Sequence, residues 1–169
     1  MNNWTNGEAW LPEGADLGLC SVEKNQDGWV VEAIAPNSAA CPECGVLSTA
    51  RHSSYIRHLK DLPVQVVAAR LRLGGGRWRC CNKNCEQQIF CQRLERVTEK
   101  RASETRRCEE IIQQVAYALG GRPGERLVRR WGVRCSKNTL LRRIKRWARS
   151  RPATAKISVL GVDEWAWVQ

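Results

Sequence analysis

The sequence of 169 residues has few of the features that mark membrane or secreted proteins. It contains no run approaching the ~18 consecutive apolar residues of a membrane-spanning helix, so we expect no membrane partner. The start, MNNWTNGEAW, has neither the basic region nor the apolar stretch of a signal peptide. We therefore expect a cytoplasmic protein. Internal repeats and low-complexity tracts are also absent from the sequence.

Acidic residues are scarce through most of the chain. Residues 41–156 hold 27 basic and nine acidic residues, whereas residues 1–40 hold one basic and six acidic, and the net charge is +11. Such a basic block is typical of proteins that bind polyanions, although charge runs can also be simple solvated surface. Arginine outnumbers lysine and clusters on predicted helices, which favours two-pronged contacts to phosphate or guanine. We expect nucleic acid as the partner.

Cysteine is abundant, with nine residues. Without a secretion signal, this number indicates a reducing compartment and metal binding rather than disulfides. Cys41 and Cys44 form one pair in CPECG, and Cys80 and Cys85 form a second in CCNKNC, where Cys81 competes for either place. Two such knuckles separated by a β-hairpin predict a zinc ribbon, in which four thiolates surround Zn²⁺ as a tetrahedron. Bound zinc would supply folding free energy that so small a segment lacks.

Other interpretations of the cysteines remain open. The pairs could be buried structural thiols or a redox C-x-x-C motif, although no βαβ pattern surrounds them. The choice between Cys80 and Cys81 is open, and Cys91 is a reserve ligand. Both histidines, His52 and His58, are predicted to lie on the surface, with His52 as a substitute ligand. The remaining thiols are predicted to be buried in the core: Cys20, Cys108 and Cys135.

The pattern of the first 95 residues predicts β-structure within an α+β fold. In residues 1–40, DLGLCSV and GWVVEAIA flank EKNQDG, and Asp27-Gly28 suits the turn of a β-hairpin. An isolated hairpin is marginal, so we expect it to pack on the next segment of the chain. That segment, residues 41–95, is predicted to form the zinc-binding domain. Its two β-like stretches are expected to turn at Gly74-Gly75-Gly76, because glycine tolerates positive φ.

Residues 96–150 predict an all-α domain of three helices. The first runs from about Ser103 to Leu119, and the second from Pro123 to Trp131. The third is capped by Ser136 and follows SKNTLLRRIKRWARS. The short glycine-containing turn before it predicts a helix-turn-helix, whose second helix enters the major groove of DNA. The third helix should bury one apolar stripe: Leu140, Leu141, Ile144, Trp147 and Ala148.

The polar side of the third helix supplies the predicted DNA contacts. Residues near its start are expected to reach base edges: Asn138, Thr139, Arg142 and Arg143. Others are expected to touch phosphates, which position the protein without reading sequence: Arg129, Arg130, Lys145, Arg146 and Arg149. Lys137 belongs to the same polar side. The alternative is an amphipathic helix of any small bundle, with its charges solvated.

Residues 151–169 begin with a linker and end on VLGVDEWAWVQ, an apolar strand followed by Asp163 and Glu164. Together with this ending, three motifs stand in a distinctive order: CPECG with RHSSYIRHLKDLPVQ, LRLGGGRWRCCNKNCEQQIFCQRL, and YALGGRPGERLVRRWGVRCSKNTLLRRI. In this order they resemble bacterial insertion-sequence transposases of the ISL-three group over nearly all of residues 17–167. The resemblance implies an N-terminal zinc-binding region, a helix-turn-helix and a ribonuclease-H-like catalytic domain with an Asp-Asp-Glu triad. It implies Cys41, Cys44, Cys80 and Cys85 as structural zinc ligands, and terminal inverted repeats of a mobile element as the double-stranded DNA bound.

The resemblance also implies that Asp163 is the first acid of the triad, which in a complete enzyme holds two Mg²⁺ ions. Here six residues follow it. We therefore expect residues 151–169 to be a linker and a truncated first strand, and this chain alone to be inactive. Full-length transposase or a second copy are further expected partners. One alternative is an active transposase completed by a separate or frameshifted product, and another is a zinc-stabilised protein-interaction module.

Overall fold

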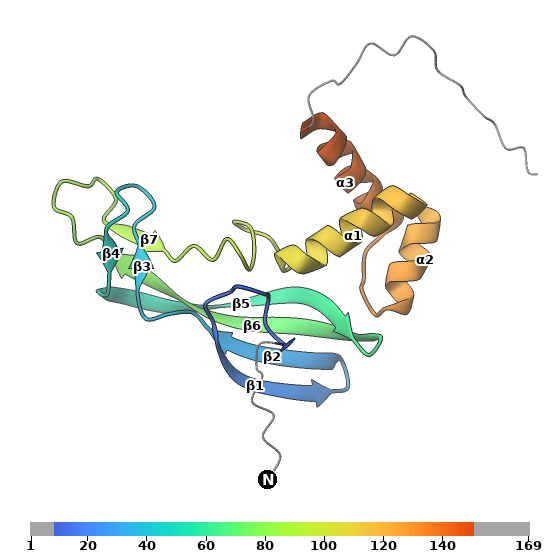
Figure 1. The fold of residues 1–169 in the computed structure, drawn as a ribbon, viewed down its shortest axis with the longest axis horizontal. Helices are drawn as coiled ribbons and strands as arrows, with labels where there is room; N and C mark the ends of the chain where they lie inside the picture. The colour runs from blue at the N-terminus through green and yellow to red at the C-terminus, as the bar shows by residue number, and fades with distance from the viewer. Residues whose placement is uncertain (1–8, 151–169) are drawn as a thin grey trace, which may run out of the picture.

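The computed structural model describes residues 9–150 (Figure 1). Asp163 and the predicted strand before it lie outside these residues. The described chain places seven strands before three helices, a mixed α and β composition compatible with the predicted α+β class. Across residues 9–150, no helix has the length and apolar character needed to cross a membrane.

One five-stranded sheet dominates the first hundred residues. Its strands lie in the order β1-β2-β6-β5, and the short β7 pairs with β6 beyond the end of β2. β2 runs parallel to β6 and antiparallel to β1, so the predicted N-terminal hairpin shares a sheet with the cysteine-bearing segment. The bounds of these strands are Gly18–Asn25 (β1), Gly28–Ile34 (β2), Arg51–Val64 (β5), Val67–Arg79 (β6) and Ile89–Cys91 (β7). A separate two-stranded sheet pairs β3 (Ala39–Ala40) with β4 (Leu47–Ser48).

The triple glycine lies inside β6, so the prediction of a turn there was wrong. The chain turns instead at Gln65 and Val66, whose φ angles are 53° and 63°. A Cβ on Gly75 would stand 2.7 Å from the ring of Tyr55, and one on Gly76 would stand 2.7 Å from Trp78. These glycines therefore make room for two aromatic rings that lie against the strand, a role that composition alone does not distinguish from a turn.

One face of the sheet is buried, and its core lies there. The segments at 10–19 and 94–97 pack on this face and cover it. Between the register shifts at the two ends of β5, alternate residues of β5 and β6 point to the other face, where several are exposed. The buried residues of this core are Leu11, Val31, Ala33, Leu59, Leu71, Leu73 and Val97.

The helices are α1 (Arg106–Leu119), α2 (Arg122–Arg130) and α3 (Lys137–Ser150). The first begins three residues later than predicted, because the hydroxyl of Thr105 accepts a hydrogen bond from the Cys108 amide and so caps it (3.3 Å). Gly132 adopts φ 77° after α2, and the next amide, of Val133, donates to the carbonyl of Val128 (2.9 Å). This is a Schellman ending. The three helices share one core: Cys108, Ile112, Val115, Ala116, Val128, Val133 and Leu140.

The helical unit is attached directly to the sheet. The Lys60 amide donates to the carbonyl of Ser103 (2.9 Å), and the Thr105 amide donates to the carbonyl of Lys60 (2.8 Å). Gly132 lies so close to β6 that an added Cβ would stand 2.8 Å from the backbone nitrogen of Ala68. The helices lie at one end of the sheet, and the β3–β4 and β7 region lies at the other (Figure 1).

Candidate metal centre and nucleic-acid surface

The first cysteine pair lies in the tight turn between β3 and β4. The Cys41 amide donates to the carbonyl of Val46, and the Gly45 amide donates to the carbonyl of Cys41, both at 2.9 Å. Gly45 has φ 72°, a conformation that favours glycine and lets the chain reverse just after Cys44. The backbone amide of Val46 points at the sulfur and lowers the pKa of Cys44 to about 7. This turn therefore favours a thiolate at Cys44.

The second pair lies in the loop between β6 and β7. The Cys80 amide donates to the carbonyl of Gln88 (2.8 Å), and the Cys85 amide donates to the carbonyl of Asn82 (3.1 Å). The Asn82 amide lowers the pKa of Cys80, but burial and the neighbouring thiols outweigh it and raise that pKa to about 12. Before metal binds, the cluster thus pairs a stabilised thiolate with protonated thiols, and zinc would have to displace protons from it.

The two loops bring four sulfurs together. The Sγ atoms of Cys41, Cys44, Cys80 and Cys85 all lie within 4.8 Å of one another. Cys41 and Cys85 are 3.9 Å apart, and Cys44 and Cys80 are 3.6 Å apart. A tetrahedron with Zn–S bonds of ~2.3 Å has edges of about 3.8 Å, whereas a disulfide bond is only about 2.05 Å long. The four thiols therefore fit zinc and are unpaired.

The structure selects between the alternatives for the metal ligands. Cys80 belongs to the group, whereas Cys81 is exposed and its sulfur lies 3.5 Å from the Ser48 hydroxyl. Cys91 and His52 are also exposed and outside it. In the part of the chain that the structure describes, the four cysteines are the only group of three or more possible metal ligands.

The remaining thiols only partly match their predicted burial. Cys108 is fully buried in the helical core, as predicted, and burial raises its pKa to about 12. Cys135 is half-buried against the same core. Cys20 is exposed, so its prediction was wrong, because a bulge between Leu19 and Ser21 interrupts the regular alternation of β1.

A small apolar core supports the metal centre, and sequence reasoning missed its polar member, Gln92. Trp78 is 1% exposed and packs with Phe90, Ala39 and the cysteines. The side-chain oxygen of Gln92 accepts from the Trp78 ring nitrogen (3.4 Å), and its nitrogen donates to the Pro36 carbonyl (3.1 Å). Gln92 thus holds the segment that precedes the first cysteine pair against Trp78 of β6. Nothing in the local pattern QRL marks it as buried.

Comparison with known families agrees with this geometry. Residues 37–85, which include all four clustered cysteines, match the family model described as the zinc-finger of transposase IS204/IS1001/IS1096/IS1165. Over these residues the chain is similar to the zinc ribbon of ISL3-type transposases. The match points to the N-terminal region of a transposase, and it ends before the helices begin. No curated protein and no solved structure matches the chain.

Beyond the zinc ribbon, α3 presents most of its basic residues to solvent. Asn138 and Arg142 are exposed one helical turn apart, while Lys137 and Thr139 are half-buried. The Arg142 guanidinium donates to the Thr139 hydroxyl (3.3 Å), which holds its long side chain along the helix. Further exposed cations continue this surface along α3 and at the end of α2: Lys145, Arg146, Arg149, Arg129 and Arg130.

Arg143 differs from its neighbours on α3. Its guanidinium pairs with Glu104 and, at 3.8 Å, with Glu109, and its side chain is only 14% exposed. Glu104 precedes α1 and Glu109 lies in its first turn, so the pair fastens α3 to α1. Arg143, which was predicted to reach base edges, therefore forms an intramolecular ion pair instead.

The apolar stripe of α3 is buried only in part. Leu140 is fully buried, and the Trp147 ring meets Tyr117 of α1 edge-on, with centroids 4.9 Å apart. Leu141 is 42% exposed and Ala148 is exposed, so two members of the predicted stripe lie outside the core. Leu141 lies beside Gly121, at the start of α2, where the glycine has no side chain to cover it.

Proposed function

We propose that this chain is the DNA-binding N-terminal region of an ISL3-type transposase and that it recognises the terminal inverted repeats of a mobile element. The observation that carries the proposal is the matched zinc ribbon at residues 37–85, followed by a three-helix unit with a cationic third helix. Asp163 lies outside the described residues, and the proposed role needs DNA binding only.

In this proposal the zinc ribbon is structural. Zn²⁺, when bound by Cys41, Cys44, Cys80 and Cys85, would cross-link two loops whose shared buried core is small. The amide of Val46 lowers the pKa of Cys44 to about 7 and so favours one of the thiolates that the metal requires, whereas Cys80 would give up its proton on binding. The ribbon would then hold one end of the sheet while the helices at the other end meet DNA.

The helices α2 and α3 would act as a helix-turn-helix. The connection at 131–136 is short and contains the positive-φ Gly132, and α3 starts directly after it with most of its cations facing solvent. Asn138 and Arg142 suit adenine and guanine edges in the major groove. Arg143 is assigned a positioning role because Glu104 and Glu109 already engage it. The exposed cations would contact phosphates: Arg129, Arg130, Lys145, Arg146 and Arg149.

The test is fluorescence anisotropy of the zinc-loaded chain across a salt series. One labelled duplex carries the terminal repeat flanking the coding sequence, and the other has the same composition in scrambled order. The proposal predicts tighter binding to the repeat that persists at moderate salt. Equal, steeply salt-dependent binding to both duplexes would show a basic protein with non-specific affinity and would overturn the proposal.

A further inference from the structure

The face of the sheet opposite its core carries an unusual arrangement of charge. Lys60 of β5 stands directly opposite Arg70 of β6, and His58 stands directly opposite Arg72. The neighbours Leu59 and Leu71 point into the core, so these basic side chains point to the other face, where Lys60, Arg70 and His58 are exposed. Two adjacent cross-strand positions are therefore occupied by basic residues.

Like charges placed directly opposite each other destabilise a sheet. Arg72 is compensated by an ion pair with Glu32 of β2. Lys60 and Arg70 form no ion pair with any residue of 9–150, and Lys60 donates only to the carbonyl of Arg134 (3.4 Å). No ion pair within residues 9–150 offsets the repulsion between them, whereas an anionic partner would.

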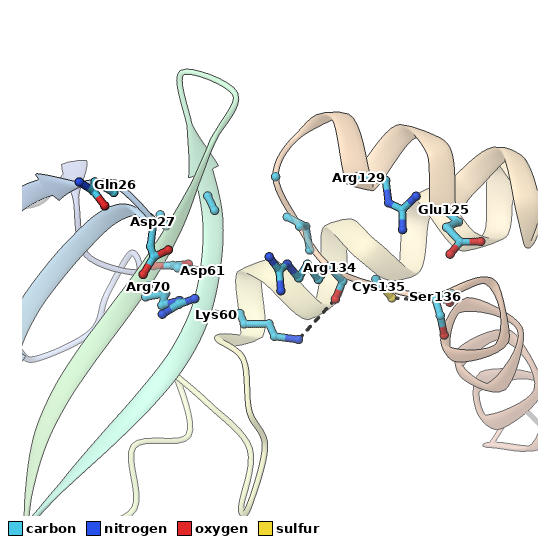
Figure 2. Close-up of a pocket in the computed structure, with 14 residues that line it drawn as sticks. Gln26, Asp27, Lys60, Asp61, Arg70, Glu125, Arg129, Arg134, Cys135 and Ser136 are labelled. Carbon is cyan, nitrogen blue, oxygen red and sulfur yellow. Dashed lines mark hydrogen bonds between the residues drawn. The ribbon is translucent and has the colours of Figure 1, made fainter.

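These two side chains line a cleft between the sheet and the helical unit (Figure 2). The cleft has a volume of about 870 Å³. Arg129 and Arg134 line its other wall, from α2 and the connection to α3. The acidic residues that line it are Asp27, Asp61 and Glu125, of which Asp61 is already paired with Arg107. Four cations thus face two uncommitted carboxylates.

The cleft leads directly to the start of α3. Ser136, whose hydroxyl accepts from the Thr139 amide (3.3 Å), lies in its lining. The walls are held in register by the close approach of Gly132 to Ala68 and by the hydrogen bonds of Lys60 to Ser103 and Arg134. A duplex seated on α3 would therefore meet the sheet at a fixed place.

We propose that Lys60 and Arg70 form a second DNA-backbone contact, which binds phosphates beside the base pairs read by α3. The inference rests on the proposed function and extends the DNA-binding surface from the helices onto the sheet. We take duplex DNA as the partner because Lys60 and Arg70 line the same cleft as Arg129, which the proposed function assigns to phosphate contacts. Such contacts add affinity without sequence preference.

The test compares two double variants that each remove two positive charges. Lys60→Gln with Arg70→Gln alters the proposed contact. Lys83→Gln with Arg93→Gln is the matched control, because both residues are exposed and form no ion pair within residues 9–150, with Lys83 in the β6–β7 loop and Arg93 just after β7. Binding to the terminal-repeat and scrambled duplexes is measured by anisotropy over a salt series, and the unfolding midpoint of each variant is recorded.

The K60Q/R70Q protein should bind both duplexes more weakly by the same factor, with an unchanged ratio between them. Its slope of log K against log salt should be shallower by about 1.8, since each lost phosphate contact removes about 0.9. The control should keep the wild-type slope. If the double variant unfolds, Arg70→Gln alone should reduce the slope by about 0.9.

The outcomes separate this inference from the function on which it rests. Wild-type protein that shows no preference for the repeat overturns the proposed function and this inference together. An intact preference with an unchanged salt slope in both K60Q/R70Q and R70Q overturns this inference alone. That second result would favour a protein partner for this face of the sheet, which also exposes Ile34 and Ile56.

Discussion

Arg107 of α1 forms a two-pronged ion pair with Asp61 of β5, with Nε–Oδ1 at 2.8 Å and Nη2–Oδ2 at 2.5 Å. The Asp61 side chain is 1% exposed, and its Oδ1 also accepts from the hydroxyl of Thr105, the cap of α1 (2.7 Å). Arg107 donates further to the carbonyls of Trp10 and Leu11. One ion pair therefore joins the sheet, the first helix and the N-terminal segment.

Asp61→Ala should destabilise the protein by ~3–5 kcal/mol, because it leaves the partly buried Arg107 and the buried Thr105 without their partner. Urea unfolding followed by circular dichroism measures the change. The control is Arg106→Ala, which breaks the exposed pair with Glu99 and should cost less than ~1 kcal/mol. Equal losses in the two variants would show that the Asp61 contact does not join the units.

The β5–β6 turn predicts a stabilising substitution. Gln65 and Val66 both have positive φ, the geometry of a type I′ turn, which suits Asn-Gly far better than a β-branched residue. Replacing them with Asn-Gly should stabilise the fold by ~1–2 kcal/mol. Thermal and urea unfolding test this. Gln26→Asn in the β1–β2 turn, where φ is not positive, should gain nothing and serves as the control.

The glycine run predicts position-dependent effects of alanine. Gly75→Ala and Gly76→Ala place a Cβ 2.7 Å from the rings of Tyr55 and Trp78, so each should destabilise by ~1–3 kcal/mol. Gly74→Ala meets the Cγ2 methyl of Ile34 at 3.4 Å and the Ala33 carbonyl oxygen at 3.7 Å, which are ordinary van der Waals contacts, and should be tolerated. A similar loss at all three positions, measured by urea unfolding, would contradict the assigned role of the glycines.

The metal centre predicts a pattern of thiol reactivity. Iodoacetamide at pH 8 should modify the exposed Cys20, Cys81 and Cys91 of the zinc-loaded protein. Chelation should add the four ligands, because the two cysteine loops lose their cross-link and open, while Cys108 stays unmodified in both states because it is fully buried in the helical core. Peptide mass spectrometry reads each site. Labelling of Cys41, Cys44, Cys80 and Cys85 that is indifferent to chelation would rule out the proposed zinc site.

Local sequence patterns predicted the features that depend on local chemistry. The spacing of the cysteines identified the four sulfurs that the structure brings together, with Cys81 excluded only by the fold. Helical periodicity found all three helices, and the β1–β2 hairpin formed where Asp27-Gly28 indicated a turn. These features depend on neighbours within a few residues, so composition and spacing carry the necessary information.

Long-range contacts account for the errors. Tyr55 and Trp78 explain why Gly75 and Gly76 lie in a strand, yet Tyr55 is twenty residues from its partner. Arg143 resembles any other cation of α3 until Glu104 packs against it. Gln92 is likewise buried where distant partners, among them the carbonyls of Pro36 and Ser38, accept its hydrogen bonds. Local periodicity does not encode such pairings.

The most direct test of the account compares DNA discrimination by wild-type protein and by Arg142→Ala, with Arg149→Ala as the control. Equilibrium binding is measured on the terminal-repeat duplex, on single-base variants of it and on the scrambled duplex at one salt concentration. Arg142→Ala should cost ~1–3 kcal/mol on the repeat and relax preference at one base pair, whereas Arg149→Ala should weaken all duplexes alike. If both substitutions cause equal losses on every duplex, α3 does not read sequence and the central claim is wrong.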